Sequence, residues 1–367
     1  MSRPRLTRPC VDQLTPYTPG KPIEEVQREY GLTDIIKLAS NENPLGPSPA
    51  AVEAICQSAA AVRLYPDNDC YHLRRALAEK LGVMPNQVLV GHGSDELIHN
   101  IGLAFICPGD EVMMCSGPFS QWEFAAKLMD GVPVYVPMKD YRYDTAEMAR
   151  RVSERTKLVF IGSPNNPTGT IVTRQELAAF MGAVPHSTIV VMDEAYYEYV
   201  DDPDYPDSLE LVRQGRPVIV LRTFSKIYAL AGLRVGYGAA PPELAEALER
   251  VREPFNVSTV AQAAALASLM DGEQVERTRA LNRESKAYLY RQFDRLGLSY
   301  PPSQANFVWV DVGRDCRKVF GGLLRRGVIV RTGDIFGAPT HLRVTTGTRE
   351  QNERFAGALE EVLAASE

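Results

Sequence analysis

The chain has 367 residues, of which 45% are hydrophobic and 23% charged, and its formal net charge is −6. This acidic balance disfavours a nucleic-acid partner, which requires a basic surface, and the length exceeds what one hydrophobic core usually serves, so we expect two unequal domains. The N-terminus lacks the apolar run of a secretory signal, and no segment approaches the roughly 20 apolar residues of a membrane span. The six cysteines form no CxxC pair. We therefore expect a cytoplasmic protein with reduced thiols and no membrane or metal site.

Short apolar runs alternate with longer amphipathic runs over the first two thirds of the chain. This rhythm is typical of an α/β protein with a largely parallel sheet. The expected strands are Gln87–Gly91, Glu111–Cys115, Leu158–Ile161, Thr188–Asp193, Val218–Arg222 and Arg234–Gly238. The expected helices between them are Ser94–Ile106, Phe119–Met129, Thr145–Val152 and Arg174–Met181.

The pattern changes after Pro254. Here we expect one long helical stretch from about Val260 to Leu296, a strand at Asn306–Val312, a helix at Cys316–Arg326, short strands near Val328 and Leu342, and a closing helix from Arg349. The change predicts a large domain over residues 35–255 and a small domain that combines an N-terminal arm, 1–34, with residues 256–367.

Polar motifs follow the predicted strands, at the edge where open α/β sheets bind their ligands. In the first motif, Val90–Glu96, a strand ends in glycines and a helix is expected to start at Ser94. The free backbone N–H groups of a helix N-terminus suit a phosphate. Ser94 followed by two acidic residues is also good capping chemistry without any ligand, so both interpretations stay open for this motif alone.

Two further strand ends carry groups that suit a pyridine ring. The segment Ser163–Thr170 has two consecutive asparagines between prolines, which is unusual for a plain turn, and an Asn amide there can donate to a phenolic oxygen. Asp193 ends an apolar strand, where a carboxylate is costly unless it is paired. A protonated pyridine nitrogen is one such partner, and a structural salt bridge is the alternative.

The fourth motif contains a lysine in an unusual setting. Lys226 follows an apolar strand, with Thr223 and Ser225 beside it and Arg234 shortly after it. The hydroxyls and the guanidinium suit an anion, which leaves Lys226 free to attack a carbonyl. The glycines after Arg234 do not form a dinucleotide fingerprint, because they have the wrong spacing and precede a strand.

Together these motifs resemble those of fold-type I pyridoxal-phosphate (PLP) enzymes, and in detail those of the histidinol-phosphate aminotransferases of class II. The similarity runs nearly the whole length of the chain, through Leu14–Pro22, Ile36–Pro49, Tyr65–Asp67, the four motifs, Ser303–Val308 and Leu342–Thr348. It implies the fold-type I α/β architecture: a large PLP-binding domain with a mostly parallel sheet flanked by helices, and a smaller α+β domain.

The resemblance also implies roles for individual residues. Lys226 would carry PLP as a Schiff base and act as the catalytic acid and base. Asp193 would pair with the pyridine nitrogen, Asn166 and Tyr196 would hydrogen-bond the phenolic oxygen, and Phe119 would stack on the ring. The cofactor's phosphate would be held by the backbone amides of Ser94 and Asp95, the hydroxyls of Thr223 and Ser225, and Arg234.

The implied assembly is a homodimer in which Tyr65 reaches the phosphate in the neighbouring subunit. Arg343 would grip the anionic group of the substrate, with Arg331 and Tyr17 as helpers. The implied reaction transfers an amino group between L-histidinol phosphate or imidazole-acetol phosphate and glutamate or 2-oxoglutarate, in histidine biosynthesis. One departure is His92, where many relatives have asparagine, and we assign it no role.

Three alternatives remain open. The first is an aromatic (Phe/Tyr) aminotransferase on the same scaffold, and the second is a related PLP decarboxylase. The third is a non-catalytic PLP-binding regulatory domain; such domains usually follow a DNA-binding head, and no helix-turn-helix segment or basic arm precedes Tyr17.

Overall fold

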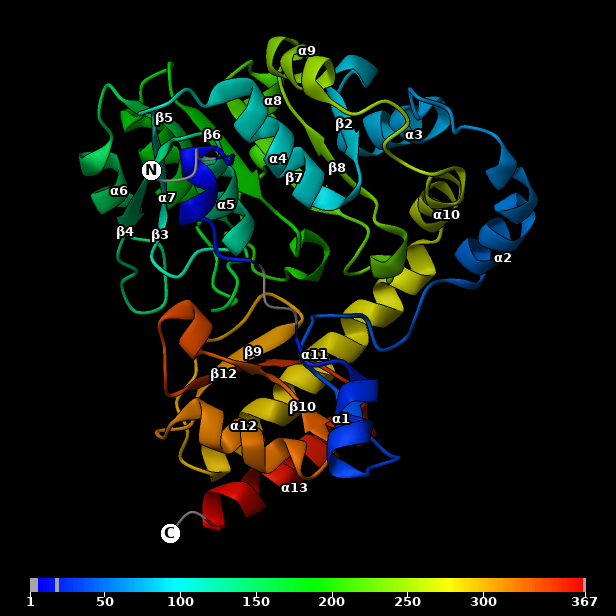
Figure 1. Ribbon diagram of the computed structural model, residues 1–367, viewed down its shortest axis with the longest axis vertical. Coiled ribbons are helices and arrows are strands. Elements are labelled where there is room, and N and C mark those ends of the chain that lie inside the picture. Colours follow the sequence, from blue (N-terminus) through cyan, green and yellow to red (C-terminus); the bar gives the residue numbers. More distant parts are fainter. Residues whose placement is uncertain (1–5, 17–19, 366–367) are drawn as a thin grey trace.

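The computed structural model describes residues 6–16 and 20–365, which form a large upper part and a smaller lower part in Figure 1. The large part is built on a seven-stranded sheet with the order β2-β8-β7-β6-β5-β3-β4. Only β8 runs against the others, since it pairs antiparallel with both β2 and β7 while all other pairs are parallel. The strands are β2 (Val88–Gly91), β3 (Glu111–Cys115), β4 (Val132–Val136), β5 (Thr156–Gly162), β6 (Ile189–Asp193), β7 (Val218–Thr223) and β8 (Gly236–Ala239).

Helices cover both faces of this sheet. Because the central strands are buried on both faces, their sequences are continuous apolar runs. In β5, Leu158 and Phe160 enter one hydrophobic cluster while Val159 and Ile161 enter the other. The first face is covered by α4 (Gly93–Phe105), α5 (Ser120–Leu128) and α9 (Pro242–Val251). The second is covered by α3 (Tyr71–Leu81), α6 (Thr145–Arg151), α7 (Arg174–Ala183), α8 (Ser208–Arg213) and α10 (Thr259–Met270), and α2 (Pro49–Ser58) packs on α10.

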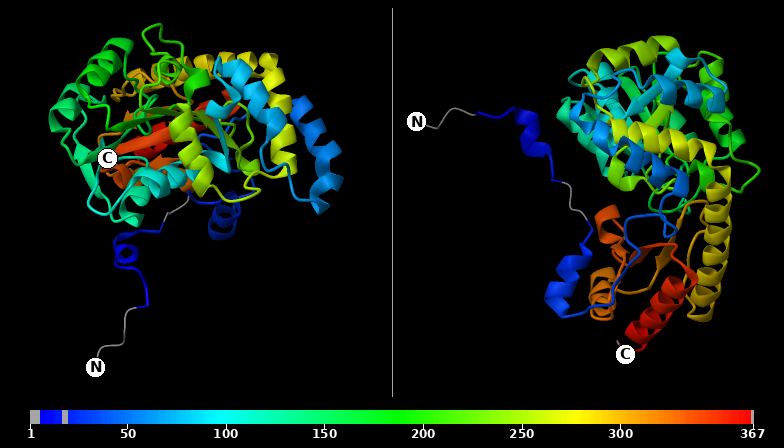
Figure 2. Two further views of the ribbon diagram at one scale, coloured as in Figure 1. Left: turned by 90° about the horizontal axis from the view of Figure 1, so that it is seen from above. Right: turned by 90° about the vertical axis from the view of Figure 1, so that its right-hand side faces the viewer.

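The smaller part has a three-stranded antiparallel sheet and a two-stranded parallel pair. Its strands are β1 (Ile36–Lys37), β9 (Phe307–Asp311), β10 (Val328–Ile329), β11 (Arg331–Thr332) and β12 (His341–Thr345). Its helices are α1 (Ile23–Tyr30), α12 (Cys316–Leu324), α13 (Arg349–Ala364) and the second half of α11 (Gly272–Arg295). Figure 2 shows α11 running along one side of the molecule from the large part to the small part. The prediction of a mostly parallel sheet flanked by helices is confirmed.

The predicted long helix is wrong in one respect, because it is two helices. The chain turns at Asp271, whose carboxylate accepts a hydrogen bond from the backbone N–H of Gln274 (3.1 Å) and caps the start of α11. Asp followed by Gly is a typical helix boundary, so the signal was present in the sequence. The elements also absent from the predicted set are the strands β1 and β4 and the helices α1, α2, α3, α8 and α9.

The boundary between the domains remains a prediction, and we propose it with one adjustment. β1 lies inside the range expected for the large domain, yet Ile36 pairs with Val328 and Lys37 with Ile329 of the small part. Residues 36 and 37 are therefore better grouped with the small domain. None of the helices in the described ranges is long and apolar enough to cross a membrane.

The register of the central strands brings the polar motifs together. Gly162 at the end of β5 is opposite Asp193 at the end of β6, and Asp193 is opposite Leu221 of β7. Because these strands are parallel, the segments that follow them emerge at the same edge of the sheet. The small part covers this edge (Figure 1).

Candidate active site

A cleft of about 540 Å³ lies where the strands of the large sheet end, and it is bordered on the other side by the small part. Its lining includes every predicted site residue except Tyr65 and Tyr17; the latter lies outside the described residues. The predicted residues in the lining are Ser94, Asp95, Phe119, Asn166, Asp193, Tyr196, Thr223, Ser225, Lys226, Arg234, Arg331 and Arg343. Residues up to 249 positions apart in the sequence, from Ser94 to Arg343, thus meet at one site.

Lys226 is held inside the cleft by the backbone. Its Nζ donates a hydrogen bond to the carbonyl oxygen of Ser40 (3.3 Å) and lies 5.8 Å from the centre of the Tyr196 ring. Burial, and then the nearby positive charge of Arg343, lower the pKa of Lys226 from its usual 10.5 to about 8. A lowered pKa gives a larger fraction of neutral amine near pH 7, which is what a nucleophile or a general base requires.

A second buried lysine shows that a low pKa alone does not mark an active site. Burial also lowers the pKa of Lys286 to about 8, but its Nζ donates to the carbonyl oxygen of Ser303 (2.7 Å), and it does not line the cleft. The distinguishing property of Lys226 is therefore its access to the cleft.

The reaction of cofactor-free protein with PLP should follow the titration of Lys226. The neutral amine is the reactive form, so the rate of Schiff-base formation should rise as the pH rises through about 8, well below the 10.5 of an ordinary lysine. Stopped-flow absorbance after mixing with PLP measures this rate. Arg343→Gln removes a positive neighbour and should shift the midpoint upward. A midpoint near 10.5 in the unmodified chain would contradict the environment described for Lys226.

Asp193 is a buried carboxylate at the end of β6. Its Oδ1 accepts a hydrogen bond from the backbone N–H of Ala195 (3.2 Å), and burial raises its pKa from 3.8 to about 6. The structural salt bridge considered for this motif belongs instead to the next residue: Glu194 accepts two hydrogen bonds from Arg222 (3.0 and 2.8 Å), and both side chains are buried. Asp193 therefore remains available to pair with a cation in the cleft.

An anion cradle lies at the N-terminus of α4. The helix begins at Gly93, one residue before the predicted start, and so the interpretation of Ser94 as the N-cap is wrong. The N-cap is His92, whose side chain makes no capping hydrogen bond. Arg234 reaches this helix end: its guanidinium contacts the carboxylate of Asp95 (3.1 Å) and the hydroxyl of Ser225 (3.4 Å). Backbone N–H groups, hydroxyls and a guanidinium form the donor set that a phosphate monoester requires.

Two glycines allow this close approach. A Cβ added to Gly93 would meet the guanidinium of Arg234 at 2.6 Å, and a Cβ added to Gly236 would meet the backbone of Gly93 and Ser94 at 2.5 Å. Such separations are too short for real atoms, so a larger residue at either position must displace the cradle.

Gly236→Ala should therefore weaken PLP binding. We expect the PLP dissociation constant to rise at least about tenfold, which corresponds to a loss of ~1.4 kcal/mol in binding free energy. Displacement of the cradle by the added methyl group is sufficient to cause such a loss. Gly232→Ala is the matched control, because a Cβ there meets nothing within 4 Å. Fluorescence titration of cofactor-free protein with PLP measures both variants. Equal affinity for the two variants would contradict the cradle.

Arg343 connects the cleft to the small domain. One guanidinium nitrogen donates to Oδ1 of Asn166 (2.6 Å) and another to the carbonyl oxygen of Ala39 (2.6 Å). Arg331 is its direct neighbour across the β11–β12 pair, so both arginines lie at the same end of the cleft. Two adjacent guanidinium groups suit a carboxylate or a phosphate.

Aromatic side chains border the same cleft. Phe119 meets Trp122 edge-on (6.1 Å between centroids), and Trp122 stacks on Phe160 in the core behind it. Phe336 of the small part lies 5.8 Å from the guanidinium of Arg343. The cleft therefore has apolar walls next to its cationic end.

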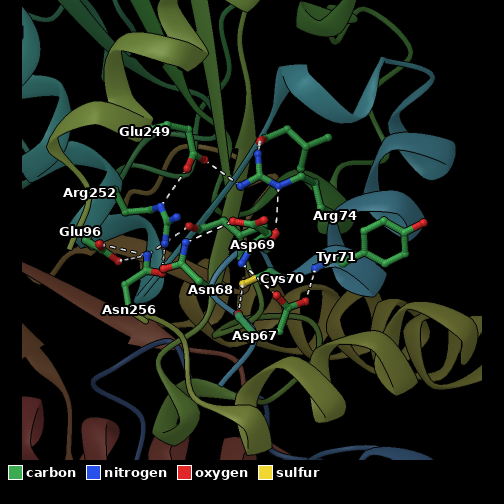
Figure 3. A network of polar contacts seen from close by, with 12 residues as sticks. Asp67, Asn68, Asp69, Cys70, Tyr71, Arg74, Glu96, Glu249, Arg252 and Asn256 are labelled. Atoms are coloured by element: carbon green, nitrogen blue, oxygen red, sulfur yellow. Dashed lines mark hydrogen bonds and ion pairs between the residues drawn. The ribbon is translucent and has the colours of Figure 1, made fainter. Parts of the chain in front are cut away.

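Tyr65 lies outside the cleft of its own chain. The residue is 82% exposed, and its ring stacks on Phe255 with 4.7 Å between the centroids. A network of hydrogen bonds and ion pairs connects the two segments that carry these rings (Figure 3). In this network Phe255 donates its backbone N–H to Asn68 (3.0 Å), and Asn256 donates to Glu96 of α4 (2.9 and 3.0 Å).

Arg74 and Arg252 complete the network by binding the two carboxylate oxygens of Glu249 (2.7 and 2.9 Å). Glu96 also accepts from the backbone N–H of His92 at the entrance to α4 (2.5 Å). The exposed Tyr65–Phe255 pair is thus tied to the same helix end that forms the anion cradle.

Sequence reasoning did not assign roles to several residues at the site. The carbonyl oxygen of Ser40 accepts a hydrogen bond from Lys226, and the side chain of Asn41 donates one to Tyr196. Both residues lie in a segment that was part of the resemblance, but neither was given a role. Tyr143 does not line the cleft but lies behind it: it is buried, donates to Oδ1 of Asn165 (3.3 Å) and accepts from the backbone N–H of Gly162 (3.0 Å), which does line the cleft. The signal for the first pair was the polar run Ser-Asn-Glu-Asn after an apolar strand; no pattern in the sequence distinguishes Tyr143.

Comparison with known proteins agrees with this geometry. Residues 33–359 match the family model "Aminotransferase class I and II". The chain belongs to this aminotransferase family. It is therefore an aminotransferase that depends on PLP, as the resemblance in the sequence implied, and the donor set of the cleft fits this cofactor.

Individual relatives narrow the comparison within the family. A histidinol-phosphate aminotransferase from Moorella thermoacetica is 56% identical over 97% of this chain and 93% of the relative. A crystal structure of a histidinol-phosphate aminotransferase from Sinorhizobium meliloti in complex with PLP has a TM-score of 0.92 at 30% identity, with all of both chains covered. Aspartate aminotransferase from Thermus thermophilus with maleate has a TM-score of 0.84 at 27% identity, covering 98% of this chain and 99% of the other. The predicted resemblance is confirmed.

Proposed function

We propose that this aminotransferase exchanges the amino group between L-histidinol phosphate or imidazole-acetol phosphate and glutamate or 2-oxoglutarate, as a step of histidine biosynthesis. Support comes from the relatives named for this activity, at 46–56% identity over nearly the whole chain. The structural observation that carries the proposal is the pair Arg331 and Arg343, which lies at one end of the cleft that contains Lys226.

The cleft residues divide the chemistry between them. PLP, when bound, draws electrons from the Cα of the substrate. Lys226 would hold the cofactor covalently and would carry a proton to and from the substrate Cα; its lowered pKa suits proton exchange near neutral pH. Asp193 keeps the pyridine nitrogen protonated, which in turn gives the buried carboxylate a cationic partner.

Other residues orient the cofactor. Asn166 and Tyr196 would donate to its phenolic oxygen, and Phe119 would stack on its ring. Because Oδ1 of Asn166 already accepts from Arg343, the amide nitrogen is the group left to face the cofactor. The phosphate is held by the backbone N–H groups of Ser94 and Asp95, the hydroxyls of Thr223 and Ser225, and Arg234.

Arg331 and Arg343, the proposed substrate clamp, must bind two substrates in turn. Arg343 can pair in bidentate fashion with a carboxylate or with a phosphate, since a guanidinium fits both groups. Arg331 adds a second positive charge, and Tyr17, outside the described residues, is proposed as a further helper. The ring of Phe336 lies 5.8 Å from the guanidinium of Arg343, and an apolar wall at this point would strengthen these ion pairs by displacing water.

We also propose that the chain works as a homodimer and in the cytoplasm. The dimer is supported by the exposed Tyr65–Phe255 pair, which suits contact with the cofactor's phosphate in the second subunit. The location is supported by the six cysteines, all of which are free thiols.

A substrate panel tests the proposed function. The purified holoenzyme is given 2-oxoglutarate with histidinol phosphate, phenylalanine, tyrosine or aspartate, and glutamate formation is measured. The highest kcat/KM should be with histidinol phosphate. Activity on phenylalanine or tyrosine with none on histidinol phosphate would instead support the aromatic aminotransferase, and release of carbon dioxide without glutamate would support a decarboxylase.

A further inference from the structure

Asn41 is the residue that holds the hydroxyl of Tyr196. Its amide nitrogen lies 2.8 Å from that oxygen, and both side chains are buried. Asn41 belongs to the segment after β1, 155 residues before Tyr196 in the sequence, and it lines the cleft. Its backbone has a φ of +56°, a left-handed conformation that asparagine and glycine adopt more readily than other residues.

A small-domain threonine fixes which way the Asn41 amide points. The backbone N–H of Asn41 donates to Oγ1 of Thr345 (2.9 Å), so the hydroxyl of Thr345 is free to donate its own hydrogen to Oδ1 of Asn41 (3.0 Å). With Oδ1 occupied as an acceptor, the amide nitrogen faces Tyr196 and donates. The opposite orientation would place two donors on the threonine oxygen and leave its buried hydrogen without this partner.

The backbone of Asn41 is equally constrained. Its carbonyl oxygen accepts from the side-chain amide of Asn306 (3.0 Å), and the residue before it, Ser40, accepts from Lys226 (3.3 Å). Thr345 lies two residues after Arg343 on β12, the strand that carries the proposed substrate clamp. A continuous hydrogen-bonded path therefore leads from the clamp strand to Tyr196.

A phenolic hydroxyl that accepts from Asn41 can use its one hydrogen only in another direction. We propose that Asn41 is a positioning residue: oriented by Thr345, it occupies an acceptor site of the Tyr196 oxygen and so directs the O–H of Tyr196 toward the phenolic oxygen of PLP. This inference rests on the proposed role of Tyr196 and adds to it the residues that set the direction of its hydrogen bond.

The visible absorbance of the cofactor attached to Lys226 tests this role without relying on turnover. A donor to the phenolic oxygen stabilises its negative charge, so its loss should raise the pKa of the chromophore. Asn41→Gly keeps the left-handed backbone and its hydrogen bonds but removes the amide, and should raise the chromophore pKa by about one unit, roughly the effect of one hydrogen bond. Asn41→Asp also competes for the hydrogen of Tyr196 and should produce a larger rise.

Matched variants at Thr345 provide an independent readout. Thr345→Val removes the donor to Oδ1 of Asn41 and should shift the chromophore pKa in the same direction, whereas Thr345→Ser keeps the hydroxyl and should restore the unmodified value. The value of kcat should fall in Asn41→Gly while the KM for the amino donor stays nearly unchanged. If Asn41→Gly fails to fold, the two Thr345 variants decide the question.

The outcome for Tyr196→Phe separates the two proposals. If this variant leaves the chromophore pKa unchanged, the proposed role of Tyr196 fails. If Tyr196→Phe raises the chromophore pKa but Asn41→Gly and Thr345→Val do not, the role of Tyr196 stands and Asn41 is not its positioning residue. An Asn41→Asp variant with the unmodified pKa would show that Tyr196 donates to residue 41, the reverse of the direction proposed here.

Discussion

Replacement of Lys226 with alanine is expected to lower kcat on the order of 10⁴-fold or more and to remove the visible absorbance of the attached cofactor. The variant loses both the proposed point of covalent attachment and the group proposed to carry the proton at the substrate Cα. No other described lysine has its amine buried in the cleft beside the backbone of Ser40. Steady-state kinetics and an absorbance spectrum of the purified variant measure the two effects.

Lys286→Met is the control for this experiment. Lys286 is also buried and its pKa is also lowered to about 8, but its amine contacts Ser303 and is outside the cleft. The control variant should keep the absorbance band and the turnover, with any effect confined to stability. A yellow and active Lys226→Ala variant would refute the assignment of the attachment site.

Asp193→Asn is expected to lower kcat by roughly 10³-fold, comparable to the loss of other buried electrostatic contacts to a transition state. The amide has nearly the same shape as the carboxylate but cannot hold a proton on the pyridine nitrogen by charge. Without that charge the ring accepts electrons from the substrate Cα poorly. The variant should still fold and bind PLP, because the phosphate cradle is formed by other residues.

The neighbouring Glu194 offers a matched control for Asp193→Asn. Glu194→Gln removes the partner of the buried Arg222 and should destabilise the fold by about 3–5 kcal/mol, as measured by denaturant unfolding. Its absorbance spectrum should remain unchanged, because the pair lies outside the cleft. If Asp193→Asn retained turnover close to that of the unmodified chain, Asp193 would not be the partner of the ring nitrogen.

The sequence predicted most of the large sheet because its strands are buried on both faces and end in polar motifs. Strands such as Glu111–Cys115 could be recognised by composition alone. β4 could not, because Pro133 interrupts its apolar run and the strand lies at the edge of the sheet, where a proline is tolerated. The break at Asp271 has its own Asp-Gly signal, but the helical pattern on both sides of it led to the prediction of one continuous helix.

The candidate site was predictable where one segment carries its own signal, as at Lys226 and Asp193. Contacts between distant segments were not. The hydrogen bond from Asn41 to Tyr196 spans 155 residues, and that from Arg343 to Asn166 spans 177. Such contacts depend on how the small part packs against the sheet edge, which the local pattern of neither segment specifies.

The attachment of the cofactor to Lys226 is tested most directly by chemical trapping. Holoenzyme is reduced with sodium borohydride, which converts the bond between lysine and cofactor into a stable amine, and the digested chain is mapped by mass spectrometry. We expect one pyridoxyl-phosphate label per chain, on the peptide that contains Lys226. A label on the peptide of Lys286 or of any other lysine, with Lys226 unmodified, would contradict the proposed active site.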